Sequence, residues 1–114
     1  MLNQVVLVGR LTRNPEVKEL EDGKKLAGMT LAIPRSFKNA EGEYETDFIE
    51  TKLWNVIAEN TAEYCKKGDI VGVKGRIQSR IIEKEDKKEY AIEIVAEKVT
   101  FLSSRSEKEQ EEVK

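Results

Sequence analysis

The sequence predicts a mainly β domain in which five strands close into a barrel, with one helix between the third and fourth strands. Apolar and polar residues alternate through most of residues 2–102, as they do in half-buried strands. Only residues 57–67 change to the spacing of a helix. The 114 residues suffice for one small domain with a single core, which we place at residues 1–102.

The first strand begins within residues 2–13 and is apolar on both faces. One face carries Val5, Leu7 and Leu11, and the other carries Val6 and Val8. Such a strand is either central in the fold or gives its second face to a subunit contact. The pair Asn14–Pro15 breaks the strand.

Two hairpin turns enclose the second strand, which covers residues 26–35. The first turn is Glu21-Asp22-Gly23-Lys24, and the second lies within residues 38–43 and contains Gly42. The alternation places four apolar side chains inward: Ala27, Met29, Leu31 and Ile33.

The third strand, from Tyr44 to Val56, carries the clearest functional signal. Its inward residues are Ile49, Thr51 and Leu53, and its outward residues are Phe48, Glu50, Lys52 and Trp54. Six residues of strand separate the two outward rings by roughly 20 Å. Rings spaced along a sheet with a cation between them suit the stacking of unpaired bases. The alternative is that another subunit or the chain itself covers this face.

The helix and the last two strands follow. The helix should end with Lys66 and Lys67 in its last turn and Gly68 as its stop. Strand four, residues 69–82, points Val71, Val73, Ile77 and Ile81 inward and Lys74, Arg76, Gln78 and Arg80 outward. After a charged hairpin tip, strand five starts at Tyr90, and a slip of its phase near Ala96 indicates a bulge.

From residue 103 the chain is rich in Ser, Lys and Glu, which predicts a disordered tail over residues 103–114. The order of the other elements is that of the OB-fold, with the helix at one end of the barrel. A generic α+β sandwich remains the alternative.

Composition argues against an enzyme. The chain has no His and one Cys, which removes the usual zinc sites and Cys-His or Ser-His pairs, so neither a metal nor a cofactor is expected. The single Cys65 allows no internal disulfide and suits a reducing cytosol, where we expect it to be a small buried residue. No apolar run of about 20 residues and no secretory signal is present, so we expect a cytoplasmic protein without a membrane contact.

Four segments resemble bacterial single-stranded DNA-binding proteins, in their short form: N-Q-V-V-L-V-G-R-L-T-R-N-P-E-V (3–17), M-T-L-A-I-P-R-S-F (29–37), A-E-N-T-A-E-Y-C-K-K-G (58–68) and G-V-K-G-R-I-Q-S-R (72–80). The resemblance runs from about residue 2 to 102. It implies a homotetramer of OB-folds that wraps single-stranded DNA without reading its sequence. It also implies a role in DNA replication, repair or recombination at the nucleoid.

The resemblance assigns base-stacking rings to Phe37, Phe48 and Trp54. A fourth ring of the family falls at Ile82, which is aliphatic here. Leu20 stands where the family often has an aromatic, and Asn55 and Val56 stand where it often has basic residues. The implied groove is therefore somewhat poorer in rings and charge than is usual.

Phosphate contacts require cations, and several candidates lie near these rings. Lys74, Arg76 and Arg80 share one face of strand four, with no acid between residues 74 and 82. The remaining candidates are Arg10 near the end of strand one, Arg35 and Lys38 around Phe37, and Lys52 in strand three. Glu50 would repel a phosphate unless it is paired.

The net charge of −2 means that charge must be judged by face. Longer members of the family end in an acidic run with a Pro-Phe pair that recruits repair and replication proteins. This chain ends in Glu-Glu-Val-Lys and lacks that tip, so either it does not recruit partners by that route or the sequence is truncated. The alternative function is an OB-fold assembly module, similar to a primosome adaptor, whose exposed aromatics meet a protein.

Overall fold

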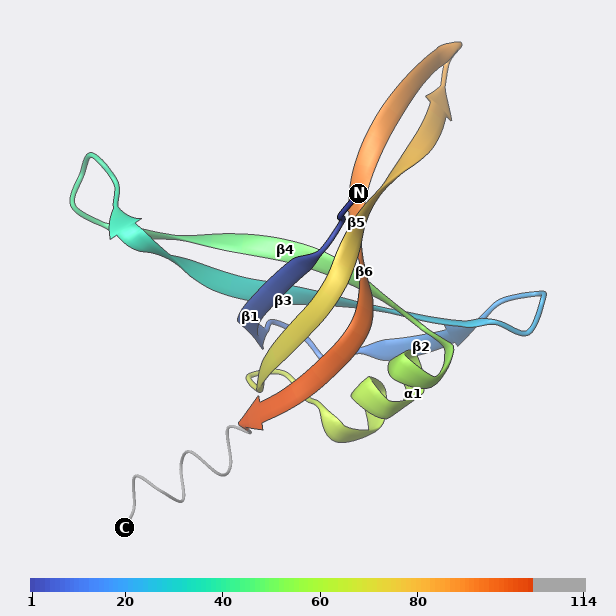
Figure 1. Cartoon of the computed structure of the whole chain (residues 1–114), viewed down its shortest axis with the longest axis horizontal. Helices are drawn as coiled ribbons and strands as arrows, with labels where there is room; N and C mark the ends of the chain where they lie inside the picture. The colour runs from blue at the N-terminus through green and yellow to red at the C-terminus, as the bar shows by residue number, and fades with distance from the viewer. Residues whose placement is uncertain (104–114) are drawn as a thin grey trace.

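The computed structural model describes residues 1–103 and confirms the predicted mainly β barrel (Figure 1). Its elements are β1 (Val5–Leu11), β2 (Glu16–Glu19), β3 (Lys25–Lys38), β4 (Tyr44–Trp54), α1 (Asn55–Tyr64), β5 (Ile70–Lys84) and β6 (Lys87–Ser103). The predicted tail falls outside the described residues, except for Ser103, which is the last residue of β6. Within residues 1–103, no helix is long and apolar enough to cross a membrane.

The strands form one sheet in the order β1-β5-β6-β4-β3-β2, and pairing of β1 with β3 closes it. Five strands therefore make the barrel, while β2 extends β3 as its antiparallel neighbour. The predicted turn is present, since Leu20 N donates to Lys24 O at 2.7 Å and Gly23 adopts a φ of 85°. We did not predict β2 as a separate strand, and it is the short partner that this turn joins to β3.

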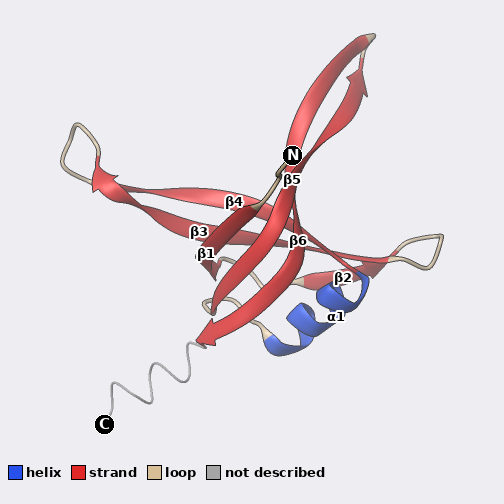
Figure 2. Ribbon diagram, viewed as in Figure 1, coloured by secondary structure: helices blue, strands red, loops and turns tan. Residues whose placement is uncertain are grey.

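The core lies inside the barrel, and α1 covers one end of it (Figure 2). The largest fully buried apolar side chains are Leu11, Met29, Leu31, Leu53, Val71 and Val73, as the alternation predicted. Ala58 and Cys65 join this cluster from α1 and its C-cap. Burial, reinforced by the charge of Asp69, raises the pKa of the Cys65 thiol to about 11, which suits the expected structural role.

The helix begins two residues earlier and ends three residues earlier than the spacing predicted. The chain leaves it at Cys65, which has extended dihedral angles. Lys66 then enters a turn in which its N–H donates to Asp69 Oδ2 at 2.9 Å. Lys67 N donates to Asn14 Oδ1 at 2.7 Å, and Gly68 adopts a φ of 96°. The turn and the contact with Asn14 take the place of helical continuation, and the contact with Asn14 is long-range, so a local pattern does not contain it.

The β3–β4 and β5–β6 hairpins extend well beyond the barrel (Figure 1). Ile77 and Ile81, which we expected in the core, are 42% and 55% exposed because the inner face of β5 leaves the barrel along this hairpin. Tyr44 of the β3–β4 hairpin and Tyr90 of the β5–β6 hairpin are also exposed. The period-two pattern identified the correct face, but it does not say where the core ends.

The predicted bulge is present where β5 and β6 change register. Lys74 pairs with Lys98, and Gly75 then pairs with Ala96, so that Glu97 is the extra residue. Gly75 lies so close to β6 that an added Cβ would stand 2.3 Å from the carbonyl oxygen of Val95. Glycine is therefore required here by close approach of two backbones.

Candidate nucleic-acid interface

The outer face of β4 presents the two rings that the alternation predicted. The Phe48 side chain is 66% exposed, and Trp54, at the end of β4, is partly exposed. Across the ladder with β3, Phe48 lies opposite Ala32 and Trp54 lies opposite Leu26. Residues directly opposite each other share a face, so the small Ala32 leaves the Phe48 ring uncovered on that side. A flat ligand can therefore reach this ring.

The same face continues from β4 across β6 to β5. Lys52 of β4 pairs in register with Val95 of β6, and Val95 pairs with Arg76 of β5. Further along β5, Gln78 lies opposite Glu93, and Arg80 lies opposite Ala91. We call the outward side chains of β4, β6 and β5 the outer face. It brings together Phe48, Trp54, Lys52, Lys74, Arg76 and Arg80 from the predicted set.

One of the three candidate cations of β5 is paired with a carboxylate, which the sequence of this strand did not indicate. Lys74 and Arg80 are exposed and form no ion pair within the described part of the chain. Arg76, by contrast, lies 3.6 Å from Glu97 Oε2 and donates to Gln78 Oε1 at 3.3 Å. Residues 74–82 of β5 contain no acid, as the sequence shows, but the neighbouring strand β6 supplies Glu97.

Lys52 is paired in the same way. Its Nζ lies 2.6 Å from Oε2 of Glu93, and the two side chains are only 29% and 14% exposed. The hydrogen bond from Lys52 is the main reason why the pKa of Glu93 lies below its usual range. The predicted cation between the two rings is thus held by a neighbouring carboxylate.

Glu50, the acid that we expected to need a partner, has one. Arg13 Nη2 lies 3.5 Å from Glu50 Oε1, and it reaches there across Gly28 of β3. Both side chains are exposed, so this pair moderates the negative charge near Phe48 without adding much stability.

Arg10 also points to the outer side of the barrel, opposite Ala32 of β3. Its Nη1 donates to the carbonyl oxygen of Gly68 at 2.6 Å, which fixes the guanidinium at the closure of the barrel. A hollow of about 360 Å³ lies beside it, lined by Val8, Gly9, Arg10, Ala32, Pro34, Thr46 and Ile70. Sequence reasoning missed this hollow because its walls come from strands that meet only when the barrel closes.

Arg35 lies apart from the outer face. Its guanidinium donates to both oxygens of Asp47 and, at 2.6 Å, to Glu45 Oε2. Asp47 precedes Phe48 in β4 and therefore points to the opposite face. Hydrogen bonding between these partners raises the pKa of Arg35 and lowers that of Asp47. The structure therefore does not bring Arg35 together with the two rings of β4.

The other predicted residues of the β3–β4 hairpin are exposed. Phe37 is 64% exposed and lies within the register shift between Pro34 and Lys38, so alternation does not assign it to the face of Phe48. Lys38 Nζ lies 5.7 Å from the centre of the Tyr44 ring, in a cation–π contact. Lys38 and Tyr44 pair in register, which places this cation on the side of β4 that carries Phe48.

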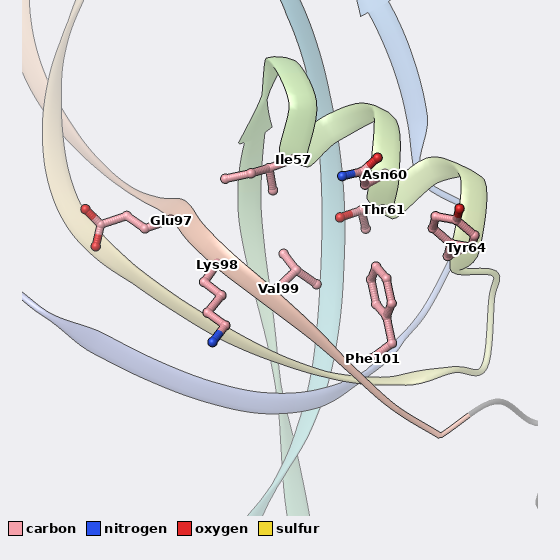
Figure 3. Close-up of a pocket in the computed structure, with 8 residues that line it drawn as sticks. All are labelled: Ile57, Asn60, Thr61, Tyr64, Glu97, Lys98, Val99 and Phe101. Atoms are coloured by element: carbon pink, nitrogen blue, oxygen red, sulfur yellow. The ribbon is translucent and has the colours of Figure 1, made fainter.

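A second hollow, of about 420 Å³, separates α1 from β6 (Figure 3). Tyr64 of α1 and Phe101 of β6 meet there with their ring centres 5.9 Å apart. Phe101 is 47% exposed at this edge. The hollow is lined by α1 and the carboxyl-terminal part of β6, whereas the rings of the outer face belong to β4.

Comparisons with known proteins agree with the fold. A family model described as the single-strand binding protein family matches residues 2–102. Single-stranded DNA-binding protein B of Bacillus subtilis is 49% identical over 106 residues, which are 92% of this chain and 94% of that protein. Single-stranded DNA-binding protein 3 of Listeria innocua is 51% identical over 106 residues, and this chain spans 66% of its length.

Solved structures show the same architecture. The crystal structure of the wild-type single-stranded DNA-binding protein from Thermus aquaticus matches 92% of this chain and 52% of its own, with a TM-score of 0.78 and 28% identity. A Plasmodium falciparum SSB in complex with ssDNA matches 90% of this chain and 96% of its own, with a TM-score of 0.77 and 26% identity.

Proposed function

We propose that this chain, which belongs to the single-strand binding protein family, binds and protects single-stranded DNA without reading its sequence. The observation that carries the proposal is the pair of accessible rings on the outer face of β4, with cations of β5 on the same face. Relatives that share about half of its residues are named single-stranded DNA-binding proteins. We further propose that it serves DNA replication, repair or recombination.

Binding requires no bond to be made or broken, and each residue type has a distinct part. Phe48 and Trp54 offer flat apolar surfaces to unpaired bases, and every base has such a surface, so sequence matters little. Lys74 and Arg80, which form no ion pair within residues 1–103, attract the phosphates most directly. Arg76 can also bind a phosphate, but the phosphate must compete with Glu97 for the guanidinium. Duplex DNA hides its bases and cannot stack on the rings.

Intrinsic fluorescence offers a direct test, because Trp54 is the one tryptophan of the chain. Titration with oligo-dT is expected to quench its emission, since a stacked indole loses fluorescence. The logarithm of the association constant should fall with the logarithm of salt concentration, by about 0.7 for each phosphate neutralised. A duplex of equal length is the control and should quench far less. A folded protein whose emission oligo-dT leaves unchanged would contradict the proposal.

We propose phosphate contacts at Arg10, Arg35 and Lys38 and a base-stacking contact at Phe37, and their support is unequal. Lys38 lies on the side of β4 that carries Phe48 and has no carboxylate partner among the described residues. Arg10 and Arg35 each hold a protein group already, so a phosphate must share or displace it. We rank Lys38 ahead of both as a backbone contact, with Phe37 as an accessible ring near it.

We also propose that the chain assembles as a homotetramer, because two apolar surfaces are left uncovered. Val6 and Val8 are 69% and 53% exposed on the outer side of β1. Residues 5–9 of β1 pair with β5 alone among the described strands, so one edge of this segment can pair with the first strand of a second copy. The second surface is the inner side of the β5–β6 hairpin, formed by Ile77, Ile81, Tyr90 and Ile92.

The Val8→Glu variant is expected to reduce the assembly to smaller species at micromolar concentration. A symmetric strand pair would bring the two new carboxylates close together in a desolvated contact, which is unfavourable. Sedimentation equilibrium measures the mass directly. Val17→Glu, at a 37% exposed position of β2, is the matched control and should keep the mass of the unmodified protein. A monomeric mass for the unmodified chain would contradict the tetramer itself.

A further inference from the structure

Glu93 occupies the middle of the outer face. It lies on β6, which runs between β4 and β5, so cations from both neighbouring strands surround it. Lys52 approaches its Oε2 at 2.6 Å from β4, and Gln78 Nε2 donates to its Oε1 at 3.4 Å from β5. Arg80 on β5 is close enough to stabilise its charge. With 14% of its side chain exposed, Glu93 is the least exposed carboxylate among the ion pairs of the described residues.

This arrangement sets a carboxylate in competition with the DNA backbone. The ammonium of Lys52 has one positive charge, and a phosphate that binds it must share it with Glu93 or displace it. The carboxylate is charged at neutral pH, because Lys52 and Gln78 both hold its pKa below the usual range. A fixed negative charge under the path of a polyanion also repels the phosphates held by Arg80.

We propose that Glu93 limits the affinity of the outer face for single-stranded DNA, by holding Lys52 back from the phosphates and by repelling the backbone. The inference rests on the proposed function, because it concerns how tightly that same surface holds DNA. In this proposal Glu93 is a positioning residue for Lys52. The role accounts for the ion pair that Lys52, a cation between two rings, forms with a carboxylate of the same chain. Faster release of DNA is the physical consequence of such an internal competitor.

The Glu93→Gln variant tests this role, because it keeps the shape and the contact with Gln78 but removes the charge. We expect oligo-dT to bind roughly five-fold more tightly at low salt, since one repulsive charge is removed and Lys52 is freed. The salt dependence should steepen by about 0.7 for each Lys52 that gains a phosphate. Fluorescence anisotropy of labelled oligo-dT at several salt concentrations measures both quantities. A role of Glu93 in folding alone would leave the slope unchanged.

Two further variants separate the possible causes. Glu63→Gln on the exposed face of α1 removes the same charge away from the outer face, and it should leave the affinity nearly unchanged. In a Lys52→Gln background, the steeper slope of Glu93→Gln should disappear. If Glu63→Gln tightens DNA binding as much as Glu93→Gln does, the effect comes from net charge and the proposal is overturned. If Glu93→Gln binds DNA more weakly than the unmodified protein, Glu93 holds Lys52 in a position that helps DNA binding, and the proposal is overturned as well. An unmodified protein that does not bind oligo-dT would instead refute the proposed function.

Discussion

Replacing Phe48 with alanine is expected to weaken binding of single-stranded DNA by about 1–3 kcal/mol for each site. This is roughly a five-fold to 150-fold loss of affinity. The reason is that the ring is 66% exposed on the outer face, where it makes few contacts that folding needs and is open to a base. Folding should therefore be almost unaffected, because a side chain that remains exposed contributes little buried area. Phe48→Ala should therefore lower the affinity for DNA without lowering the stability of the fold.

Anisotropy of a labelled oligo-dT measures the loss, and thermal unfolding of the same samples checks the fold. Tyr64→Ala supplies the control, because Tyr64 is a ring on α1 that is 64% exposed, and it lines the hollow against β6 instead of the outer face. We expect that variant to bind DNA as the unmodified protein does. If Phe48→Ala binds as tightly as Tyr64→Ala, the ring of Phe48 belongs to another contact and stacking on β4 is refuted.

The faces of the strands could be predicted from the sequence, because the alternation of side chains is a local property of extended backbone. Phe48 is exposed and Leu53 is fully buried, as expected from their positions in β4. The same rule misplaced Ile77 and Ile81, since the alternation continues along a hairpin after the barrel has ended. How far a strand extends beyond the core is decided by its neighbours in space.

The partners of the cations could not be predicted, for a related reason. Strand four contains no acid between residues 74 and 82, yet β6 brings Glu97 to Arg76. Which carboxylate meets which cation depends on register, and a shift by one residue moves every side chain to the other face. The bulge opposite Gly75 sets that register, so the electrostatics of the site follow from a feature of the backbone.

The Gly75→Ala variant is expected to destabilise the protein by about 1–3 kcal/mol, and occasionally such overpacking costs more. The added Cβ would stand 2.3 Å from the Val95 carbonyl oxygen and 3.3 Å from Cα of Ala96. Those atoms belong to the backbone of β6, which is held between β4 and β5, so they cannot rotate away as a flexible side chain can. Removing glycine restricts the unfolded chain and returns about 0.4–1 kcal/mol, which offsets only part of the loss.

Gly72→Ala is the matched control, because it makes the same chemical change three residues earlier in β5. Its Cβ would meet only side-chain atoms, the nearest being Cδ1 of Leu102 at 3.6 Å, which is an ordinary contact. Urea unfolding at equal protomer concentration should therefore show a loss for Gly75→Ala and little change or a gain for Gly72→Ala. Equal stabilities would mean that the β5–β6 ladder can shift at the bulge without cost. In that case the register that pairs Glu93 with Gln78 would not be fixed by close packing at Gly75, and the cations of the outer face would have no single arrangement.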